Sequence, residues 1–256
     1  MSEIRLEHLE YSYLDHGQRS KALSDVDVII GEGQFVCLLG RSGCGKTTLL
    51  HLAAGLERPE RGQVVIGGKP VTAPDTDRAV VFQNDTLFPW MTARKNVEFG
   101  IRHARKELGK IEARALAEEF LCKVGMADAM DKYPYQLSGG MQQRVAIARA
   151  LAMDTDILLL DEPFGALDAR NRQDLQELLV SLWSAGEHRK TVLFVTHDIG
   201  EAALLADRIL YMTPGRIAAD VAVSLPRPRD ARSEEMKHLR EQLLALFYES
   251  REEAAL

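Results

Sequence analysis

The chain has 256 residues, 46% of them hydrophobic and 27% charged, which is the composition of an ordinary globular protein with a substantial core. Its formal net charge of −6 gives no reason to expect a nucleic-acid partner, and its three cysteines, none in CxxC spacing, fit a reducing compartment and no metal cluster. The charged start, MSEIRLEHLE, is unlike a signal peptide, and no uncharged apolar run reaches the roughly 20 residues of a membrane-spanning helix.

In chain order, the hydrophobic periodicity predicts strands that alternate with helices. Strands are predicted in IRLEHLEYSYL, DVDVII, FVCLLG, QVVIGG, AVVFQ, DILLLDEP, KTVLFVTHD, RILYM and GRIAAD, and the segment YLDHGQRSKAL is predicted to be a loop. Helices are predicted in TTLLHLAAGL, RQDLQELLVSLW and GEAALLAD, and a charged helical segment runs from about Leu87 to Met153. This alternation indicates an α/β fold with a mainly parallel sheet covered on both faces and a helical insertion.

The tail has the pattern of an amphipathic helix. Its apolar stripe consists of Met236, Leu239, Leu243 and Phe247. The stripe favours a helix that closes the core over a helix dedicated to a partner.

A glycine-rich segment, GRSGCGKTT, lies between the strand pattern that ends at Gly40 and the next helix pattern. It matches the phosphate-binding loop G-x-x-x-x-G-K-[ST] in sequence and in context, which distinguishes it from a glycine-rich turn with a surface lysine. Glycines let successive N–H groups face phosphate oxygens at a helix N-terminus, Lys46 brings positive charge to the β- and γ-phosphates, and the Thr47 hydroxyl suits Mg²⁺. The predicted nucleotide-binding residues here are Gly40, Arg41, Ser42, Gly43, Cys44, Gly45, Lys46, Thr47 and Thr48.

Three further strand ends carry polar side chains that suit ATP hydrolysis. ILLLDEP places Asp161 at the end of a buried strand, where it fits the Mg²⁺ shell, and leaves Glu162 to accept a proton from the attacking water as general base. His197 follows KTVLFVT and can donate to the γ-phosphate, and Gln83 closes AVVFQ and can bridge Mg²⁺ and the water. Each would be an ordinary polar strand end if it stood alone, but together they predict a catalytic site.

The ordered set of GRSGCGKTT, Gln83, LSGGM, ILLLDEP, GALD and His197 resembles the Walker A, Q-loop, signature, Walker B, D-loop and H-loop motifs of ATP-binding cassette (ABC) proteins. This resemblance implies ATP and Mg²⁺ as cofactors and ATP hydrolysis that is coupled to transport. It also implies a P-loop NTPase core with an N-terminal antiparallel β region at 1–86 and 154–225, an inserted α-helical subdomain at 87–153 and a helical tail at 226–256.

The resemblance implies further site residues. Tyr13 lies where the family places an aromatic ring that stacks on adenine, with Tyr11 as the alternative and an ordinary strand role open for either. Asp168 resembles the D-loop aspartate that communicates between two nucleotide sites. Met141 stands where glutamine is commonest in the signature, and Gly200 replaces an acidic residue near His197, which predicts a looser helix after it.

The segment LSGGMQQRVAIARAL offers a helix N-terminus behind a serine and two glycines, but it contains no lysine. The resemblance implies that Ser138, Gly139 and Gly140 contact the γ-phosphate held by Lys46 of a second copy. Head-to-tail pairing of two copies would then complete two sites. A plain helix cap is the alternative role of Ser138, and the two roles are compatible.

The segment NDTLFPWM places a bulky apolar cluster, which includes Leu87, Phe88 and Trp90, in a predicted loop. Such a cluster is either folded inward or a docking surface. The resemblance favours docking, by a short cytoplasmic helix of a transmembrane permease subunit.

Several features separate importer from exporter cassettes. The sequence lacks fused membrane helices and has DKYPYQ in place of the glutamate-rich stretch that many exporter cassettes carry before the signature. Its segments around Gln83 and the signature are similar in sequence to those of the nitrate, sulfonate and taurine importer subgroup. This similarity implies a peripheral location at the cytoplasmic face of the cell membrane and an indirect periplasmic or extracellular solute-binding partner. The alternatives are an exporter cassette, a soluble non-transport ABC ATPase, and a lone P-loop kinase or GTPase, which would need neither LSGG nor His197.

Overall fold

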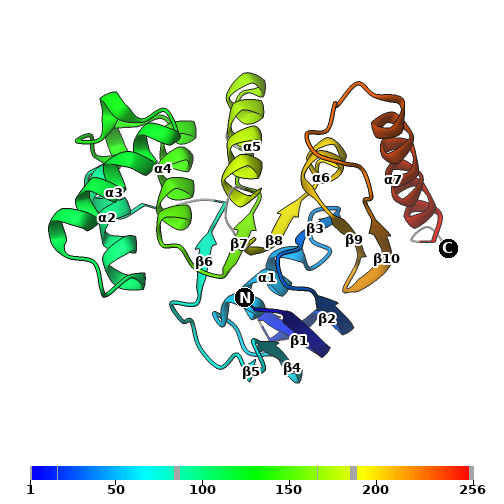
Figure 1. Ribbon diagram of the computed structural model, residues 1–256. Coiled ribbons are helices and arrows are strands. Elements are labelled where there is room, and N and C mark those ends of the chain that lie inside the picture. The colour runs from blue at the N-terminus through cyan, green and yellow to red at the C-terminus, as the bar shows by residue number, and fades with distance from the viewer. Residues whose placement is uncertain (1, 16, 84–86, 166, 185–188, 254–256) are drawn as a thin grey trace. The chain divides into compact units, whose positions relative to one another are not determined.

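The computed structural model describes residues 2–15, 17–83, 87–165, 167–184 and 189–253. The chain forms two compact units (Figure 1). The first unit consists of Met1–Pro74 and Thr191–Leu256, and the second consists of Asp75–Lys190. The predicted helical insertion at 87–153 lies within the second unit, and the predicted tail lies within the first.

An antiparallel sheet forms one layer of the first unit. Its strands are β1 (Ile4–Asp15), β2 (Gln18–Ile30), β4 (Arg61–Ile66) and β5 (Lys69–Pro70), in the spatial order β2-β1-β4-β5. Apolar residues of β1 and β2, such as Leu6 and Leu23, are fully buried, and polar residues alternate with them.

The prediction of a loop at YLDHGQRSKAL is wrong, because the described residues of this segment form the end of the β1–β2 hairpin. Tyr13 pairs with Ser20 and Leu14 pairs with Arg19. Most described side chains at this end are exposed on both faces of the hairpin, so the sequence there has no apolar alternation to indicate a strand. Gly17, at φ 81°, occupies the turn.

The second layer of the first unit is a mixed sheet in the order β10-β9-β3-β8. Its strands are β3 (Phe35–Gly40), β8 (Thr191–Thr196), β9 (Arg208–Thr213) and β10 (Arg216–Ala222). The central strand β3 is parallel to both β8 and β9, and every residue of β3 and β8 is buried. Helices α1 (Lys46–Ala54) and α6 (Ile199–Leu205) pack against these strands, as the parallel α/β prediction requires.

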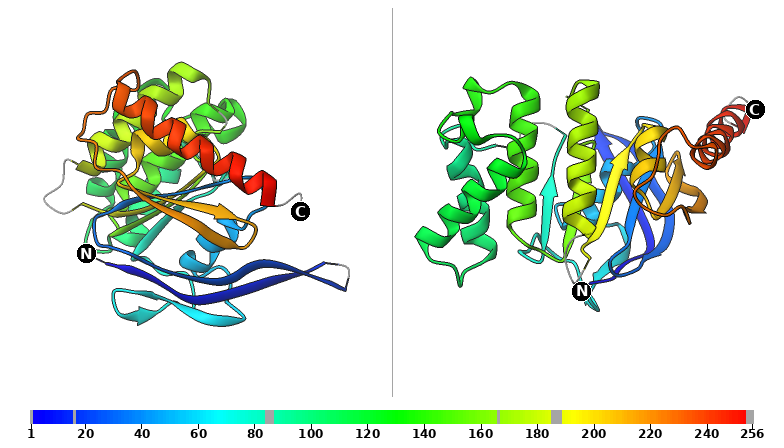
Figure 2. Two further views of the ribbon diagram at one scale, coloured as in Figure 1. Left: turned by 90° about the vertical axis from the view of Figure 1, so that its right-hand side faces the viewer. Right: turned by 45° about the horizontal axis from the view of Figure 1, so that its top comes forward.

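The tail helix α7 (Glu234–Glu253) closes the core of the first unit, as its apolar stripe predicts. Helix α7 contacts α6 (Figure 2). Met236, Leu239 and Leu243 are buried, and the Phe247 ring lies 5.0 Å from the ring of Tyr211 on β9. Two arginines of the preceding segment, Arg227 and Arg229, donate to the carbonyl oxygens at the end of α6. They satisfy the acceptors that a helix leaves unpaired at its C-terminus.

The second unit combines a parallel strand pair with helices. The pair is β6 (Arg78–Val81) and β7 (Ile157–Asp161), and the helices are α2 (Ala93–Ala104), α3 (Lys110–Lys123), α4 (Gly139–Ala152) and α5 (Ala169–Ser184). Helices α2, α3 and α4 contact one another, and α4 also contacts β6 (Figure 2). The two units together confirm the α/β class, with an antiparallel N-terminal sheet, parallel strands and a group of inserted helices.

Candidate functional site

The phosphate-binding loop lies where β3 turns into α1. Gly45, at φ 108°, is the N-cap residue of α1, and a Cβ atom there would lie 2.6 Å from the carbonyl oxygen of Ala22. Gly43, at φ 81°, borders open space, where a Cβ atom would meet nothing within 4 Å. Both positions therefore need glycine for the turn itself, and the helix starts behind a cap that has no side chain to occupy its N–H groups. Such a helix N-terminus favours an anion.

Lys46 is folded back across this loop. Its side chain is 5% exposed, and its Nζ donates to the carbonyl oxygens of Gly40 at 2.8 Å and of Arg41 at 2.9 Å. The two acceptors hold a desolvated cation directly over the loop backbone. The charge is thus positioned beside the same backbone that would cradle a phosphate.

The two candidate adenine-stacking tyrosines differ in their surroundings. The Tyr13 side chain is 41% exposed, and its hydroxyl lies 3.0 Å from Oγ1 of Thr48 on α1. Tyr11 donates to Oε2 of Glu57 at 2.8 Å, and burial together with this bond raises the pKa of Tyr11 to about 12. Their rings meet edge to face with centroids 5.0 Å apart. Tyr13 therefore lies beside the phosphate-binding helix with its ring exposed, whereas Tyr11 is directed towards Glu57.

His197 follows β8 directly and is exposed. Leu39 pairs with Thr196 in the parallel register of β3 and β8, so Gly40 and His197 follow at the same edge of the sheet. Around His197, Thr196 Oγ1 donates to Glu201 at 2.7 Å and accepts from the backbone N of Asp198 at 3.0 Å. These bonds fix the backbone on both sides of the histidine.

The helix after His197 is capped despite the glycine at position 200. Asp198 Oδ1 accepts from the backbone N of Glu201 at 3.1 Å, and α6 forms from Ile199. A Cβ atom on Gly200 would lie 3.0 Å from that same Asp198 oxygen. Glycine therefore leaves room for the cap, whereas the sequence predicted only a looser helix.

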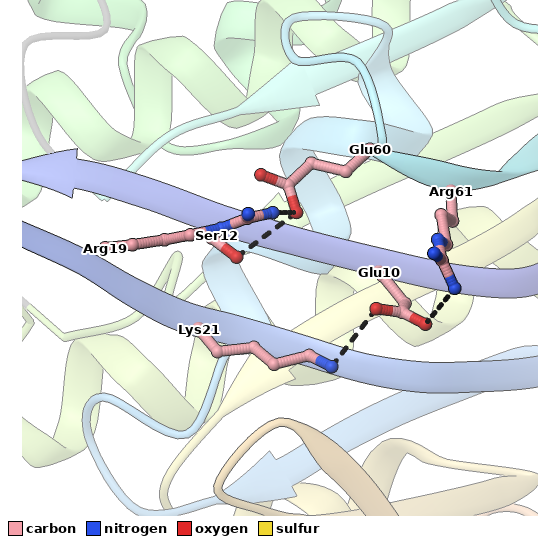
Figure 3. A pocket seen from close by; sticks show the side chains of 6 residues that line it. All are labelled: Glu10, Ser12, Arg19, Lys21, Glu60 and Arg61. Carbon is pink, nitrogen blue, oxygen red and sulfur yellow. Dashed lines mark hydrogen bonds and ion pairs between the residues drawn. The ribbon is translucent and has the colours of Figure 1, made fainter.

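A hollow of about 490 Å³ lies elsewhere, on the antiparallel sheet (Figure 3). Its lining consists of the charged and polar residues Glu10, Ser12, Arg19, Lys21, Glu60 and Arg61. Arg19 pairs with Glu60, and Lys21 and Arg61 reach Glu10 at 3.1 Å and 3.9 Å. These exposed charges neutralise one another, so the hollow is a network of surface ion pairs and not a site built for a nucleotide.

In the second unit, the ends of β6 and β7 bring two predicted catalytic residues together. Val81 pairs with Leu160, and two residues further along each strand the amide Nε2 of Gln83 donates to Oε2 of Glu162 at 3.2 Å. Asp161, which precedes Glu162, is 4% exposed at the end of the buried strand. The carboxylate and the amide are thus held side by side at the carboxyl edge, where α/β folds bind ligands.

Glu162 has an unusual backbone. Its φ of 43° lies in the left-handed region, which costs a residue with a side chain about 1–3 kcal/mol. The turn that follows holds this conformation, because the backbone N of Gly165 donates to the Glu162 carbonyl at 3.2 Å. Strain of this kind is concentrated at functional positions, and here the strained residue carries the carboxylate that accepts from Gln83.

The signature segment forms the start of α4. Ser138 is the N-cap residue, and its Oγ accepts from the backbone N of Met141 at 3.3 Å. Ser138 and Gly139 are exposed and Gly140 is half-buried, so the N-cap and the first residue of the helix are open to solvent. The side chain of Gln142 donates to the carbonyl oxygens of Pro134 and Leu137 and fixes the preceding turn. The capping role of Ser138 is thus present, and nothing in the structure explains the methionine at position 141.

Comparison with known proteins decides the family. The profile described as ABC transporter matches residues 23–165, which is more than half of the chain. The chain belongs to the ABC transporter family. It is therefore an ATP-binding protein and an ATPase of this family, as the ordered motifs predict.

Two relatives show the kind of ABC protein that the chain is similar to. It is 49% identical over 211 residues to the bicarbonate transport ATP-binding protein CmpD of Synechocystis sp., covering 81% of this chain and 74% of CmpD. It is 45% identical over 234 residues to the nitrate import ATP-binding protein NrtD of Synechococcus elongatus, covering 89% of this chain and 85% of NrtD.

A solved structure confirms the cassette fold. The structure is a dimeric, post-hydrolysis state of the ATP-binding cassette MJ0796 with ADP and Pi. It matches this chain with a TM-score of 0.79 and 35% sequence identity, over 87% of this chain and 100% of that one. Across the residues described for this ABC protein, no helix has the length and hydropathy needed to span a membrane.

The apolar cluster after Gln83 is partly internal and partly exposed in this ABC ATPase. Leu87 is buried, whereas Trp90 is 69% exposed and its ring lies 5.6 Å from that of Phe88. Phe88 also meets Phe99 of α2 edge to face at 4.9 Å. Residues 84–86, which complete the segment NDTLFPWM, lie outside the described part. The sequence posed core packing and docking as alternatives, and the structure buries Leu87 and leaves Trp90 exposed.

Several polar residues that the sequence analysis missed organise these elements. Asn96 is fully buried and bonds the backbones of Phe88, Met91 and Thr92. Gln143 is 5% exposed and extends from α4 towards the carbonyl of Phe82 at 3.5 Å. The available signal was a polar residue on the apolar face of a predicted helix, because such residues are buried only when they are hydrogen-bonded.

Proposed function

We propose that this ABC ATPase is the energising subunit of an importer, acting on separate transmembrane permease subunits and serving uptake of a small oxyanion-type solute. The similarity to CmpD and NrtD carries this proposal, because their names assign them to bicarbonate transport and nitrate import. The nitrate, sulfonate and taurine class predicted from the sequence shares with these solutes a small size and an oxyanion group. An exporter cassette and a soluble non-transport ABC ATPase are the alternatives.

The proposed hydrolytic roles follow from the side chains described above. The residues from Gly40 to Thr48 bind the phosphates of ATP, with Lys46 as the cation, and Tyr13 stacks on adenine. Thr47 of the first unit and Gln83 and Asp161 of the second are each proposed as ligands that would hold Mg²⁺, which would supply charge neutralisation at the phosphates when it is bound. The donor set fits this ion, because all three offer oxygen ligands.

The attacking water is proposed to lie against Glu162, which takes its proton, while the Gln83 amide holds the carboxylate in place at 3.2 Å. His197 donates a hydrogen bond to the γ-phosphate from the edge of the sheet in the first unit. The backbone bonds around Thr196 and Asp198 support that role by fixing the imidazole-bearing residue.

We propose that two copies pair head to tail, with Ser138, Gly139 and Gly140 of one copy reaching the γ-phosphate bound by the other. The exposed Ser138 and Gly139 at the start of α4 support this pairing, because a capped and solvated helix N-terminus can add an anion without refolding. The solved structure of MJ0796, a dimer bound to ADP and Pi, supports it independently. Asp168 is proposed to communicate between the two sites.

The proposed permease contact is the surface formed by Phe88, Trp90 and Phe99, which we call the aromatic surface. Buried Asn96 fixes the backbone of Phe88 in the aromatic surface, and the neighbouring Leu87 is buried. A rigid aromatic surface of this kind fits an amphipathic helix of the membrane subunit. The solute-binding protein contributes indirectly, and the chain lies peripherally at the cytoplasmic side of the membrane.

Replacing both Phe88 and Trp90 by alanine is expected to weaken binding to the permease subunits by about 1,000-fold, since buried aromatic anchors each contribute about 2 kcal/mol or more at interfaces. ATP hydrolysis by the isolated subunit should stay unchanged. Solute-stimulated hydrolysis with reconstituted permease measures the loss. Ile111→Ala, at an 85% exposed position of α3, is the matched control. A collapse of the folded core in Trp90→Ala would contradict the docking role.

Replacing Tyr13 by alanine is expected to raise the Kd for ATP roughly 5- to 150-fold, because base stacking on an aromatic ring contributes about 1–3 kcal/mol. Tyr13→Phe keeps the ring and should bind ATP nearly as the parent does, although it loses the bond to Thr48. Tyr11→Phe should bind ATP unchanged. A larger loss at Tyr11→Ala than at Tyr13→Ala would assign the stacking role to Tyr11.

The importer proposal is tested by reconstituting the chain with its permease and solute-binding subunits in vesicles. Hydrolysis that rises on addition of external bicarbonate, nitrate or a sulfonate, together with uptake of that anion, supports it. Outward movement of a solute, or hydrolysis indifferent to every permease, would contradict it.

A further inference from the structure

Arg144 of the signature helix binds two other segments of the second unit at once. Its Nη1 donates to the carbonyl oxygen of Val124, at the end of α3, at 2.8 Å. Its Nη2 donates to Oδ1 of Asn171, in the first turn of α5, at 2.6 Å. One planar guanidinium therefore ties α4 to the ends of two other helices.

Asn171 passes this contact on to Asp168. Its backbone N donates to Asp168 Oδ1 at 3.1 Å, and its side-chain amide donates to the other carboxylate oxygen. The bonds from Asn171 are the main cause that lowers the pKa of Asp168 below its ordinary value. The carboxylate is thus held ionised and in one orientation.

The chemistry of both side chains is specific to this arrangement. Asn171 must offer an oxygen to Arg144 and N–H groups to Asp168, and neither aspartate nor alanine offers both from its side chain. Arg144 needs two divergent donors, which a lysine ammonium cannot place in the same fork.

We propose that Arg144 and Asn171 are positioning residues that lock the signature helix to Asp168, so that this chain presents Ser138 and Asp168 to a second copy as one rigid surface. The inference rests on the proposed head-to-tail pairing. Ser138 begins α4 and Arg144 lies in the same helix, so a shift of α4 relative to α5 would separate the two elements unless the lock held. Without the lock, each element has to be ordered separately when the copies meet, and that ordering weakens association.

The experiment measures ATP-dependent dimers in a Glu162→Gln background, in which hydrolysis does not deplete ATP. Arg144→Lys and Asn171→Ala are each expected to raise the MgATP concentration for half-maximal dimer in sedimentation experiments by about tenfold, as for loss of one charged hydrogen bond. The double variant should be no worse than either single variant, because both break one chain of contacts. Arg114→Lys, which changes an exposed ion pair on α3, is the matched control.

A second readout separates positioning from general damage. The affinity of the monomer for MgADP should stay within twofold of the parent, because that ligand requires only the chain's own phosphate-binding loop. Amide hydrogen exchange at residues 167–172 should become faster in both variants, even without nucleotide.

The possible failures are distinguishable. If Glu162→Gln itself forms no dimer with MgATP, the head-to-tail pairing is wrong and the inference falls with it. If that parent dimerises but Arg144→Lys and Asn171→Ala dimerise at the same MgATP concentration, only the lock is wrong. Equal losses of MgADP affinity would also overturn it, since they would indicate a purely structural role.

Discussion

Replacing Glu162 by glutamine is expected to lower ATP hydrolysis by about 10²- to 10⁴-fold, the usual contribution of a positioned general base. Binding of ATP should persist, and ATP-stabilised dimers should accumulate. Hydrolysis is lost while binding is kept because glutamine preserves the size of the side chain, at a backbone position with φ 43°, but cannot accept the proton of the attacking water. Rapid-quench measurement of a single turnover reports the chemical step directly.

Glu177→Gln, on the exposed side of α5, is the matched control for this change. It removes the same charge from the same unit and should leave the turnover rate unchanged. A Glu162→Gln protein that hydrolyses ATP at the parental rate would remove Glu162 as the base.

Replacing Lys46 by alanine is expected to weaken ATP binding roughly 10- to 100-fold, since hydrogen bonds to charged groups contribute about 1.5–3 kcal/mol each. The Lys46 ammonium is buried and lies over the loop carbonyls of Gly40 and Arg41, so alanine removes the positive charge at the phosphate-binding loop. Isothermal titration with MgATP measures the loss.

Two companion variants keep the Lys46 result interpretable. Lys46→Arg retains the charge and should lose less affinity than Lys46→Ala, although its planar head suits the turn poorly. Lys69→Ala, at an exposed position of β5, should bind MgATP like the parent. Unchanged affinity in a folded Lys46→Ala protein would contradict the assignment of the phosphate-binding loop.

Much of the fold could be predicted because its apolar patterns are local. Every residue of β3, β7 and β8 is buried, and each of these strands coincides with a mostly apolar run in the sequence. The phosphate-binding loop could be predicted equally well. Its glycines are required by the turn from β3 into α1, and Lys46 follows them directly. The meeting of Gln83 with Glu162 follows from two parallel strands that end at one edge.

Other features depend on contacts between distant segments and left no local pattern. The β1–β2 hairpin continues through polar residues whose strand pairing is invisible to hydrophobic periodicity. The choice between Tyr11 and Tyr13 rests on Glu57 and Thr48, which lie far away in the sequence. Arg144 and Asn171 meet across 27 positions, and the strained backbone of Glu162 follows from its turn.

The central claim is that each copy of this chain carries two complementary halves of an ATP site, one around Lys46 and one around Ser138. Its most direct test is the ATP hydrolysis of an equimolar mixture of Lys46→Ala and Ser138→Arg proteins, at an MgATP concentration near the parental Kd, where each protein alone is expected to hydrolyse little ATP. Head-to-tail pairing predicts that the mixture regains hydrolysis well above either protein alone, because a hybrid pair contains one site with both halves intact. A mixture that stays as inactive as its two components would contradict the account.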